Sequence, residues 1–289
     1  MVNYRRSIPS RIFDTANVCF LIVVSSASLL PFIYLLMTSF STNQEIDRGA
    51  LVPSSFSIDA YRAAFATPLL SNGFLISAFV TLAGTSISIA LTTMMAYALS
   101  RKELPMRRAL LFLVVLTMMV NAGIIPLYLV VRSLKLVDSI WSLILPSCIG
   151  AFNVILMRNF FLTIPDELED AARLDGCSDL EVLVRIVVPL SGPALAVFVL
   201  FYGVNYWNTY FSAIMFINDP AKMPFQVALR QLLAVDQLQE LDIARLSQLP
   251  YPQALRAAAL VLSALPVLAV YPWVQRYFTT GLLLGGIKE

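Results

Sequence analysis

Histidine is absent from the 289 residues of this chain, which removes the commonest catalytic base and metal ligand. The three cysteines, Cys19, Cys148 and Cys177, are odd in number and scattered, so they indicate neither a disulfide framework nor a metal site. The sequence also has no glycine-rich phosphate loop of the GxxxxGKS, GxxxxGKT or GxGxxG type. We therefore expect no catalytic residue and no bound metal or cofactor in this chain, and no ATP hydrolysis by the chain alone.

Charged residues are also scarce: they make up 13% of the chain, against 58% hydrophobic residues, and the mean hydropathy is +0.78. A soluble domain of this length could not bury so much apolar surface, so the composition indicates an integral membrane protein. A helix needs about 20 residues to cross a bilayer core about 30 Å thick. Six stretches meet this requirement, at approximately 13–40, 69–99, 109–131, 141–162, 190–216 and 254–278. The sequence predicts an all-α protein with six transmembrane helices in a single domain, 1–289.

The orientation in the membrane is predicted from basic residues, which favour the cytoplasmic side in short loops. They cluster before the first span and in the loop after the second: Arg5, Arg6, Arg11, Arg101, Lys102, Arg107 and Arg108. Both clusters place the amino terminus inside the cell. Alternation through six spans then places the carboxyl terminus and the loop 163–189 inside as well.

Acidic residues are absent from the interiors of the predicted spans, and the charges that come closest, Asp14, Arg158, Arg256 and Arg276, lie near span boundaries. Ion-coupled carriers usually need ionisable groups or broken helices within the membrane. This absence argues against a secondary transporter and equally against an intramembrane hydrolase, although both stay open as alternatives. A passive channel would leave the polar loop 163–189 unexplained.

The loop 163–189 is the most polar part of the chain. Seven carboxylates lie in it: Asp166, Glu167, Glu169, Asp170, Asp175, Asp179 and Glu181. An acidic cytoplasmic loop is a poor lipid anchor, because the inner leaflet is itself negative. We interpret it as a surface on which another protein docks.

Local signals predict a helix–turn–helix in this loop. Pro165 suits the first position of a helix that runs to Leu174, because its missing N–H needs no partner there. Gly176 can adopt the left-handed conformation that ends a helix. Ser178 and Glu181 have the spacing of a capping box and predict the start of a second helix.

The same loop resembles the EAA loop of ATP-binding-cassette (ABC) importer permeases. The family pattern is Glu-Ala-Ala, three residues, Gly, nine residues, Ile, one residue and Leu-Pro. The corresponding residues here are Asp170, Ala171, Ala172, Gly176, Ile186, Val188 and Pro189. Asp170 replaces the family's glutamate, with Glu169 directly before it, and Val188 replaces the leucine. The run 125–161 and the segment 281–288 are similar to the sugar-importer branch, which includes the second permease of the maltose importer.

This resemblance implies a type I ABC importer transmembrane domain that is embedded in the lipid of the bacterial inner membrane. The importer would work by alternating access. The resemblance further implies a homologous second permease as partner, two ATPase subunits that bind the ATP and magnesium, an extracytoplasmic binding protein, and no nucleic acid. The residues expected to couple to the ATPase are Glu169, Asp170, Ala171, Ala172, Asp175, Gly176, Ile186 and Pro189. Either Asp170 or Glu169 would pair with a basic group of the ATPase.

The substrate implied by the resemblance is a carbohydrate, although a permease for a non-sugar solute stays open. The branch handles neutral oligosaccharides, sugar phosphate esters and acidic, uronate-containing oligosaccharides, and no basic residue in the span interiors demands an anion. The fifth span carries the polar and aromatic residues expected along the substrate pathway: Tyr202, Asn205, Tyr206, Trp207 and Asn208. Amides beside flat rings suit sugars, but such groups also join helices in membranes. In the third span, a kink is expected near Asn121, Gly123 and Pro126.

Overall fold

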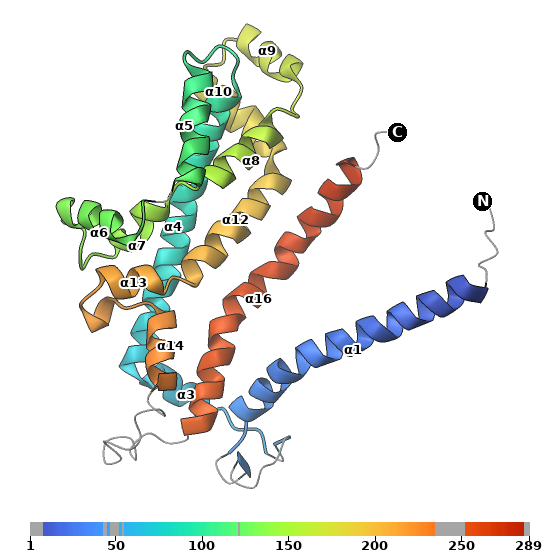
Figure 1. Ribbon diagram of the computed structural model, residues 1–289, viewed down its shortest axis with the longest axis vertical. Coiled ribbons are helices and arrows are strands. Elements are labelled where there is room, and N and C mark those ends of the chain that lie inside the picture. Colours follow the sequence, from blue (N-terminus) through green and yellow to red (C-terminus); the bar gives the residue numbers. More distant parts are fainter. Residues whose placement is uncertain are drawn as a thin grey trace. The chain divides into compact units, whose positions relative to one another are not determined.

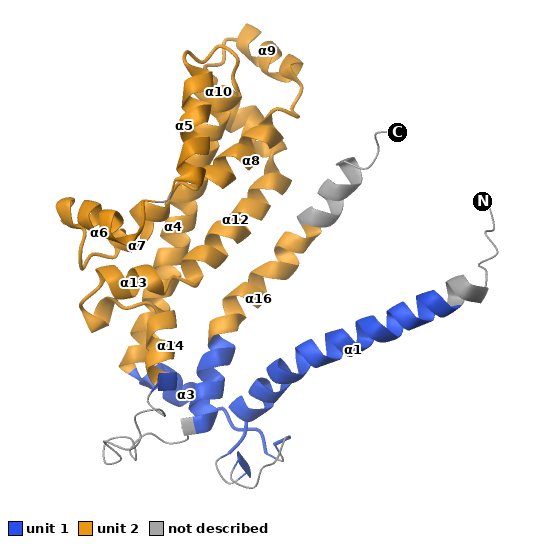
Figure 2. Cartoon of the chain, viewed as in Figure 1, with its two compact units in different colours: residues 1–67, 233–262 blue, residues 68–232, 263–289 orange. Residues whose placement is uncertain are grey.

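The computed structural model of the chain describes residues 8–42, 45–46, 52–53, 55–120, 122–234 and 252–285. Within them the secondary structure is helical and contains no strand, which confirms the all-α prediction (Figure 1). The chain divides into two compact units, 1–67 with 233–262 and 68–232 with 263–289 (Figure 2). One helix, α16 (Pro252–Gly285), contributes to both units, and the single domain expected from the sequence stays a prediction.

The first unit contains α1 (Ile8–Ser39), α3 (Asp59–Ala66) and the start of α16. The stretch Ile12–Ser39 of α1 is long and apolar enough to cross a membrane, and none of its most apolar window is buried inside the chain. Helices α3 and α16 meet through the small side chains of Ala60, Ala254 and Ala258, which allow close approach.

The second unit is built around α4 (Pro68–Ser100), which packs against α12 (Gly192–Trp207) and α8 (Ala151–Phe161). Two small or polar residues of α4 shape its contact with α12. Gly84 leaves room for the ring of Tyr206, and the hydroxyl of Ser88 lies 2.9 Å from the hydroxyl of the same tyrosine. Close approach and interhelical hydrogen bonds thus replace the hydrophobic effect, which cannot drive helix association in lipid.

Three helices are long and apolar enough to cross a membrane on their own: Ile12–Ser39, Pro68–Ser100 and Gln253–Arg276. These three helices agree closely with the predicted spans 13–40, 69–99 and 254–278. Three further pairs of helices are long and apolar enough only when the two members are joined, and each pair is bent. If each bent pair is one span, the described chain has up to six, as the sequence predicts.

Two of the bent pairs correspond to predicted spans. The span 109–131 consists of α5 (Arg107–Met119) and α6 (Ile124–Ser133), bent by 118°, and Gly123 has a positive φ of 83° between them. The expected kink is therefore present. Pro126 lies in the first turn of α6, where proline is tolerated, and Asn121 lies outside the described residues.

The span 141–162 is also broken rather than continuous. It comprises α7 (Trp141–Ile144), a 3₁₀ turn (Leu145–Ser147) and α8, with a bend of 52°. Pro146 lies inside the turn, where its ring prevents a regular helix from continuing.

The fifth predicted span, 190–216, is wrong in its limits. Helix α12 begins at Gly192 and ends at Trp207, and the separate helix α13 (Phe211–Phe216) follows. The two helical segments that are together long and apolar enough to cross a membrane are Asp179–Leu190 and Gly192–Trp207, with a bend of 86° between them. Pro193 in the first turn of α12 suits a helix start and cannot continue the preceding helix.

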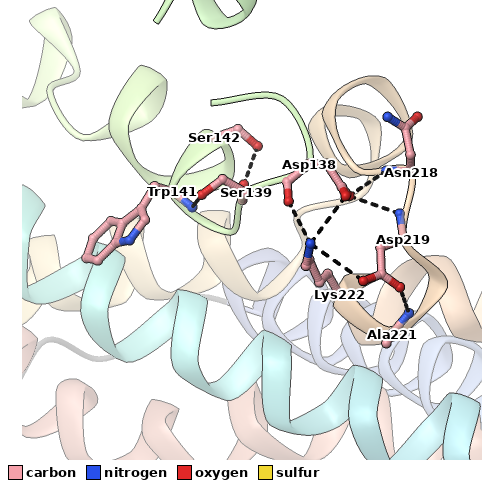
Figure 3. Close-up of polar contacts among 8 residues, drawn as sticks. All are labelled: Asp138, Ser139, Trp141, Ser142, Asn218, Asp219, Ala221 and Lys222. Carbon is pink, nitrogen blue, oxygen red and sulfur yellow. Dashed lines mark hydrogen bonds and ion pairs between the residues drawn. The ribbon is translucent and has the colours of Figure 1, made fainter. Parts of the chain in front are cut away.

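A cluster of charges joins two segments that the sequence places in separate loops, before α7 and after α13 (Figure 3). Asp138, with a φ of 63°, accepts hydrogen bonds from the backbone N–H groups of Asn218 at 3.1 Å and Asp219 at 2.9 Å. The ammonium of Lys222 donates to the Asp138 carboxylate at 3.2 Å and to its carbonyl at 3.0 Å. The 3₁₀ turn Pro220–Lys222 and the helix α14 (Phe225–Ala234) follow.

This cluster predicts a specific dependence of stability on pH. The two backbone N–H groups, and then Lys222, lower the pKa of Asp138, so its stabilisation is present above the ordinary aspartate pKa and is lost as the pH falls. The hydrogen bond to Asp138 raises the pKa of Lys222, so that contribution is present below the ordinary lysine pKa and is lost at higher pH. We expect Asp138→Asn to lower the Tm at pH 7, and the difference from wild type to shrink below about pH 4.

Thermal unfolding of both proteins in nanodiscs from pH 3 to pH 8 would measure this difference. Asp59→Asn is the matched control, because Asp59 is exposed and its carboxylate contacts only neighbouring residues, namely the hydroxyl of Ser57 at 2.8 Å and the guanidinium of Arg62 at 3.5 Å. A Tm difference that stays constant over the whole pH range would contradict the prediction.

Candidate functional site: the loop 163–189

The first helix of the loop is α9 (Asp166–Leu174), which lies beyond the end of α4 (Figure 1). Pro165 is the residue before the helix rather than its first helical residue, a shift of one position from the prediction. Three carboxylates in the first turn complement the positive end of the helix dipole.

The turn after α9 has the geometry that the sequence predicts for Gly176. Its φ is 86°, and its N–H donates to the carbonyl of Arg173 at 3.0 Å. The N–H of Cys177 donates to the carbonyl of Ala172 at 3.0 Å. This pair of bonds is the Schellman motif, which needs a left-handed residue at the position of Gly176.

The second helical segment begins at the predicted capping box. Ser178 accepts from the N–H of Glu181 at 3.4 Å, and Glu181 accepts from the N–H of Ser178 at 2.9 Å. The Glu181 carboxylate accepts from the N–H of Ser178 and also from its hydroxyl at 2.9 Å, and these two bonds, together with the charge of Arg185, lower the pKa of Glu181. The segment comprises α10 (Asp179–Val182), a π-helical turn (Leu183–Val187) and α11 (Val188–Leu190). The wider turn lies directly before Pro189, whose ring would clash with a regular helix.

The predicted coupling residues fall on two faces of α9. Glu169 and Ala172 are buried inside the chain, whereas Asp170, Ala171 and Leu174 are exposed. Ala172 therefore belongs to the core of its own chain. The sequence resemblance had suggested that Ala171 and Ala172 both contact the ATPase, but only Ala171 is exposed. Of the others, Asp175, Gly176 and Pro189 are exposed and Ile186 is partly buried.

Much of the acidity of the loop is neutralised within the chain. Four of the seven carboxylates form ion pairs: Glu169–Arg101, Asp166–Lys102 at 3.1 Å, Asp179–Arg173 at 3.1 Å and Glu181–Arg185 at 3.3 Å. Among the described residues, Glu167, Asp170 and Asp175 form no ion pair, and all three are exposed. These three carboxylates are therefore accessible to another protein.

Two of the predicted pathway residues are buried tyrosines that hold the broken span α7–α8. Tyr202 lies with its hydroxyl 2.6 Å from the hydroxyl of Thr92 and accepts the N–H of Gly150 at 3.3 Å. Tyr206, which also contacts Ser88, donates to the carbonyl of Ile144 at 3.2 Å. Gly150 and Ile144 lie on either side of the break, so the two hydroxyls satisfy backbone groups that the break leaves without helical partners.

The remaining three predicted pathway residues differ in exposure. Trp207 is buried, donates to the carbonyl of Ser263 at 2.7 Å and stacks on Phe225. Asn205 and Asn208 are exposed on another side of α12. The structure therefore separates the amides from the aromatic rings that the sequence analysis grouped together.

Comparison with known proteins gives the family. The sequence model of the binding-protein-dependent transport system inner membrane component matches residues 3–283. The chain belongs to this family. It is accordingly a permease component of a transport system rather than a catalytic enzyme.

Its relatives cover nearly the whole permease. The polygalacturonan/rhamnogalacturonan transport system permease protein YtcP of Bacillus subtilis (strain 168) is 46% identical over 283 residues, 96% of this chain and 99% of the relative. Protein LplC of the same organism is 41% identical over 281 residues, 96% of this chain and 95% of the relative. A crystal structure of a bacterial ABC transporter involved in the import of the acidic polysaccharide alginate matches with a TM-score of 0.87 and 34% identity, over 94% of this chain and 98% of that one.

The residues of this permease that hold the acidic loop were not predicted from the sequence. Arg101 and Lys102 served there only as indicators of orientation, but both form ion pairs with α9. A signal was present, because a basic loop and an acidic loop predicted on the same side of the membrane can meet. Which acid each base would contact depends on the rotation of α9, and no local pattern gives that.

Proposed function

We propose that this permease forms half of the translocation pathway of an ATP-driven importer of acidic, uronate-containing oligosaccharides. The observation that carries the substrate class is the near full-length similarity to a polygalacturonan/rhamnogalacturonan permease, which a transporter of the acidic polysaccharide alginate independently supports. Both polygalacturonan and alginate are polymers of uronic acids. The partners are a homologous second permease, two ATPase subunits and an extracytoplasmic binding protein.

The exposed face of α9 is the proposed contact with the ATPase. Glu167, Asp170, Ala171 and Leu174 have the spacing of one helix face, and Leu174 is 89% exposed. A nearly fully exposed leucine between unpaired carboxylates fits a cleft that combines an apolar floor with basic groups. ATP and magnesium would bind to the ATPase subunits, since the permease has no phosphate-binding loop.

The substrate pathway is proposed along the exposed side of α12. Phe201, Asn205 and Asn208 have the spacing of one helix face and are all exposed, with Phe201 at 42%. Their amides can hydrogen-bond sugar hydroxyls, and the ring can stack on a sugar face. Gln226 donates to the side-chain carbonyl of Asn208 at 3.3 Å and orients its amide. In this proposal Tyr202, Tyr206 and Trp207 support the pathway from behind.

The permease is proposed to lie in the bacterial inner membrane with both termini in the cytoplasm. The ion pairs of Arg101 with Glu169 and Lys102 with Asp166 support a common side for the basic loop and the acidic loop. Because basic loops favour the cytoplasm, the acidic loop would face the ATPase there.

Reconstitution into liposomes tests this function. The permease pair alone should not hydrolyse ATP, whereas the complete transporter should hydrolyse ATP faster with a binding protein loaded with oligogalacturonate. Uptake of oligogalacturonate should exceed that of a neutral maltooligosaccharide by about tenfold or more, since one charge-assisted hydrogen bond contributes about 1.5–3 kcal/mol. Equal uptake of both sugars would reject the acidic substrate. Uptake driven by a proton gradient without the ATPase would favour a secondary transporter instead.

A further inference from the structure

We propose that Arg101 is a positioning residue for energy coupling, because its ion pair with Glu169 anchors α9 to the end of α4. Helix α9 would then move together with α4 as one body. This inference rests on the proposed function of α9 as the contact with the ATPase. It also assigns the two neighbouring acids different tasks, with Glu169 holding the helix from inside and Asp170 left free for the partner protein.

The side chains of the ion pair are largely buried, and the arginine is held in place. The side chains of Arg101 and Glu169 are 17% and 3% exposed. The guanidinium of Arg101 lies 4.5 Å from the ring centroid of Tyr97, and its Nε donates to the hydroxyl of Ser100 at 3.0 Å. Arginine suits such a site because its planar group can stack and hydrogen-bond at the same time.

The end of α4 is itself a fixed point. The carbonyl of Leu99 accepts a hydrogen bond from Arg107 Nε at 3.0 Å and another from Arg158 Nε at 2.9 Å. These arginines belong to α5 and α8, so three helices meet at one carbonyl in the last turn of α4. Arg101 follows two residues later and therefore starts from a rigid base.

The other contacts between α9 and the end of α4 are weak by comparison. Lys102 and Asp166 are 74% and 69% exposed, and an exposed ion pair contributes little. A polar cavity of about 130 Å³ lies between α9 and the ends of α4 and α8, lined in part by Arg101, Glu169 and Arg173. Ala172 adds apolar packing in the core cluster that contains Tyr97 and Phe161, and the buried Arg101–Glu169 pair is the polar link between α9 and the end of α4.

Anchoring Glu169 also fixes the rotation of α9 about its axis. Residues three or four apart share a helix face, so Glu169 and Ala172 point inward together. Asp170, Ala171 and Leu174 are then turned outward. If the ion pair is lost, α9 can rotate or tilt and this outward face loses its fixed orientation.

The test compares Arg101→Gln, Glu169→Gln and the double variant Arg101→Gln/Glu169→Gln with the matched controls Lys102→Gln and Asp166→Asn. Spin labels on cysteines at the exposed positions Glu103 and Leu174 report the distance between the end of α4 and α9. The full chain, free of its native cysteines, is measured in nanodiscs with its permease partner but without the ATPase. Co-purification of the ATPase and the sugar imported per ATP hydrolysed are measured in parallel on unlabelled complexes.

We expect a narrow distance distribution in the wild type and in both controls, and a broad one in the three variants. Removing one partner leaves an uncompensated buried charge, so the single variants should also yield less folded protein. The double variant removes both charges and should recover its yield, yet its distance distribution should stay broad and its sugar imported per ATP should fall by about tenfold. A double variant with normal distances and normal coupling would show a merely structural pair and overturn the proposal.

Failure of the proposed function gives a different result. If Asp170→Lys leaves ATPase binding unchanged, α9 is not the contact, whatever the distances show. A broad distance distribution in the double variant together with normal ATPase binding and coupling would overturn the positioning role. The distance measurement needs no ATPase, so the two conclusions stay separate.

Discussion

Replacing Asp170 with lysine is expected to lower the amount of ATPase that co-purifies with the permease by about tenfold or more, and to abolish sugar uptake. Asp170 is exposed and forms no ion pair among the described residues, so reversing its charge leaves the fold intact. At a docking surface the same reversal sets like charges against each other, which costs several kcal/mol. Co-purification from detergent at low and moderate salt, with uptake in cells, measures both effects.

Two substitutions control this prediction. Asp170→Glu restores the acid that the family usually has and should be tolerated. Asp59→Lys changes an exposed acid of α3, which belongs to the other compact unit, and should leave ATPase binding unchanged. Full binding and full uptake with Asp170→Lys would show that this face of α9 does not contact the ATPase.

Gly176→Val should give the same loss of coupling by a different route. A Cβ at this position would meet nothing within 4 Å, so the cost comes only from the positive φ of 86°. Such strain amounts to about 1–3 kcal/mol and lies in the turn after α9, so the protein should still reach the membrane. Gly192→Val is the control, because Gly192 also has open space around it but no positive φ. Equal coupling in the two variants would show that the turn conformation is not required.

Gly84→Ala is expected to produce the largest loss of folded permease. A Cβ at Gly84 would lie 2.8–2.9 Å from three ring atoms of Tyr206. The ring cannot easily move, because Tyr206 is 1% exposed and its hydroxyl is bound to Ser88 and to the carbonyl of Ile144. Overpacking of this kind costs about 1–3 kcal/mol. The Tm in nanodiscs and the folded fraction on size-exclusion chromatography measure the effect.

The control for Gly84→Ala lies in the same helix pair. A Cβ at Gly203 on α12 would meet only the hydroxyl oxygen of Thr85, at the ordinary contact distance of 3.8 Å. Gly203→Ala should therefore be nearly neutral. Tyr206→Phe should not rescue Gly84→Ala, because it keeps the ring. Equal Tm values for the two glycine variants would contradict the close packing of α4 on α12.

The sequence predicted best what depends on local or continuous signals. The uninterrupted apolar run 69–99 became α4 (Pro68–Ser100) within one residue at each end. The capping box at Ser178 and the left-handed Gly176 are set by a few neighbouring residues, and both are confirmed. These features need no knowledge of distant contacts.

What the sequence could not give depends on residues far apart in the chain. The break between α7 and α8 is satisfied by hydroxyls from α12, so it could not be read from residues 141–162 alone. Tyr202 and Tyr206 were predicted to contact sugar because a tyrosine side chain suits sugar binding as well as it suits hydrogen bonding between helices. The split of Glu169 and Asp170 between two faces likewise depends on Arg101, which is 68 residues away from Glu169.

The hydroxyls of Tyr202 and Tyr206 also have a consequence for synthesis of the chain on the ribosome. Tyr202 follows Gly150 by 52 residues, and Tyr206 follows Ile144 by 62 residues. Unsatisfied backbone groups are costly in lipid, so the stretch 141–161 cannot settle fully into the bilayer when it first leaves the translocon. We expect it to reach its final state only after α12 has been translated. The fourth and fifth spans should then mature as a pair, and a ribosome stalled between them should hold an incompletely inserted permease.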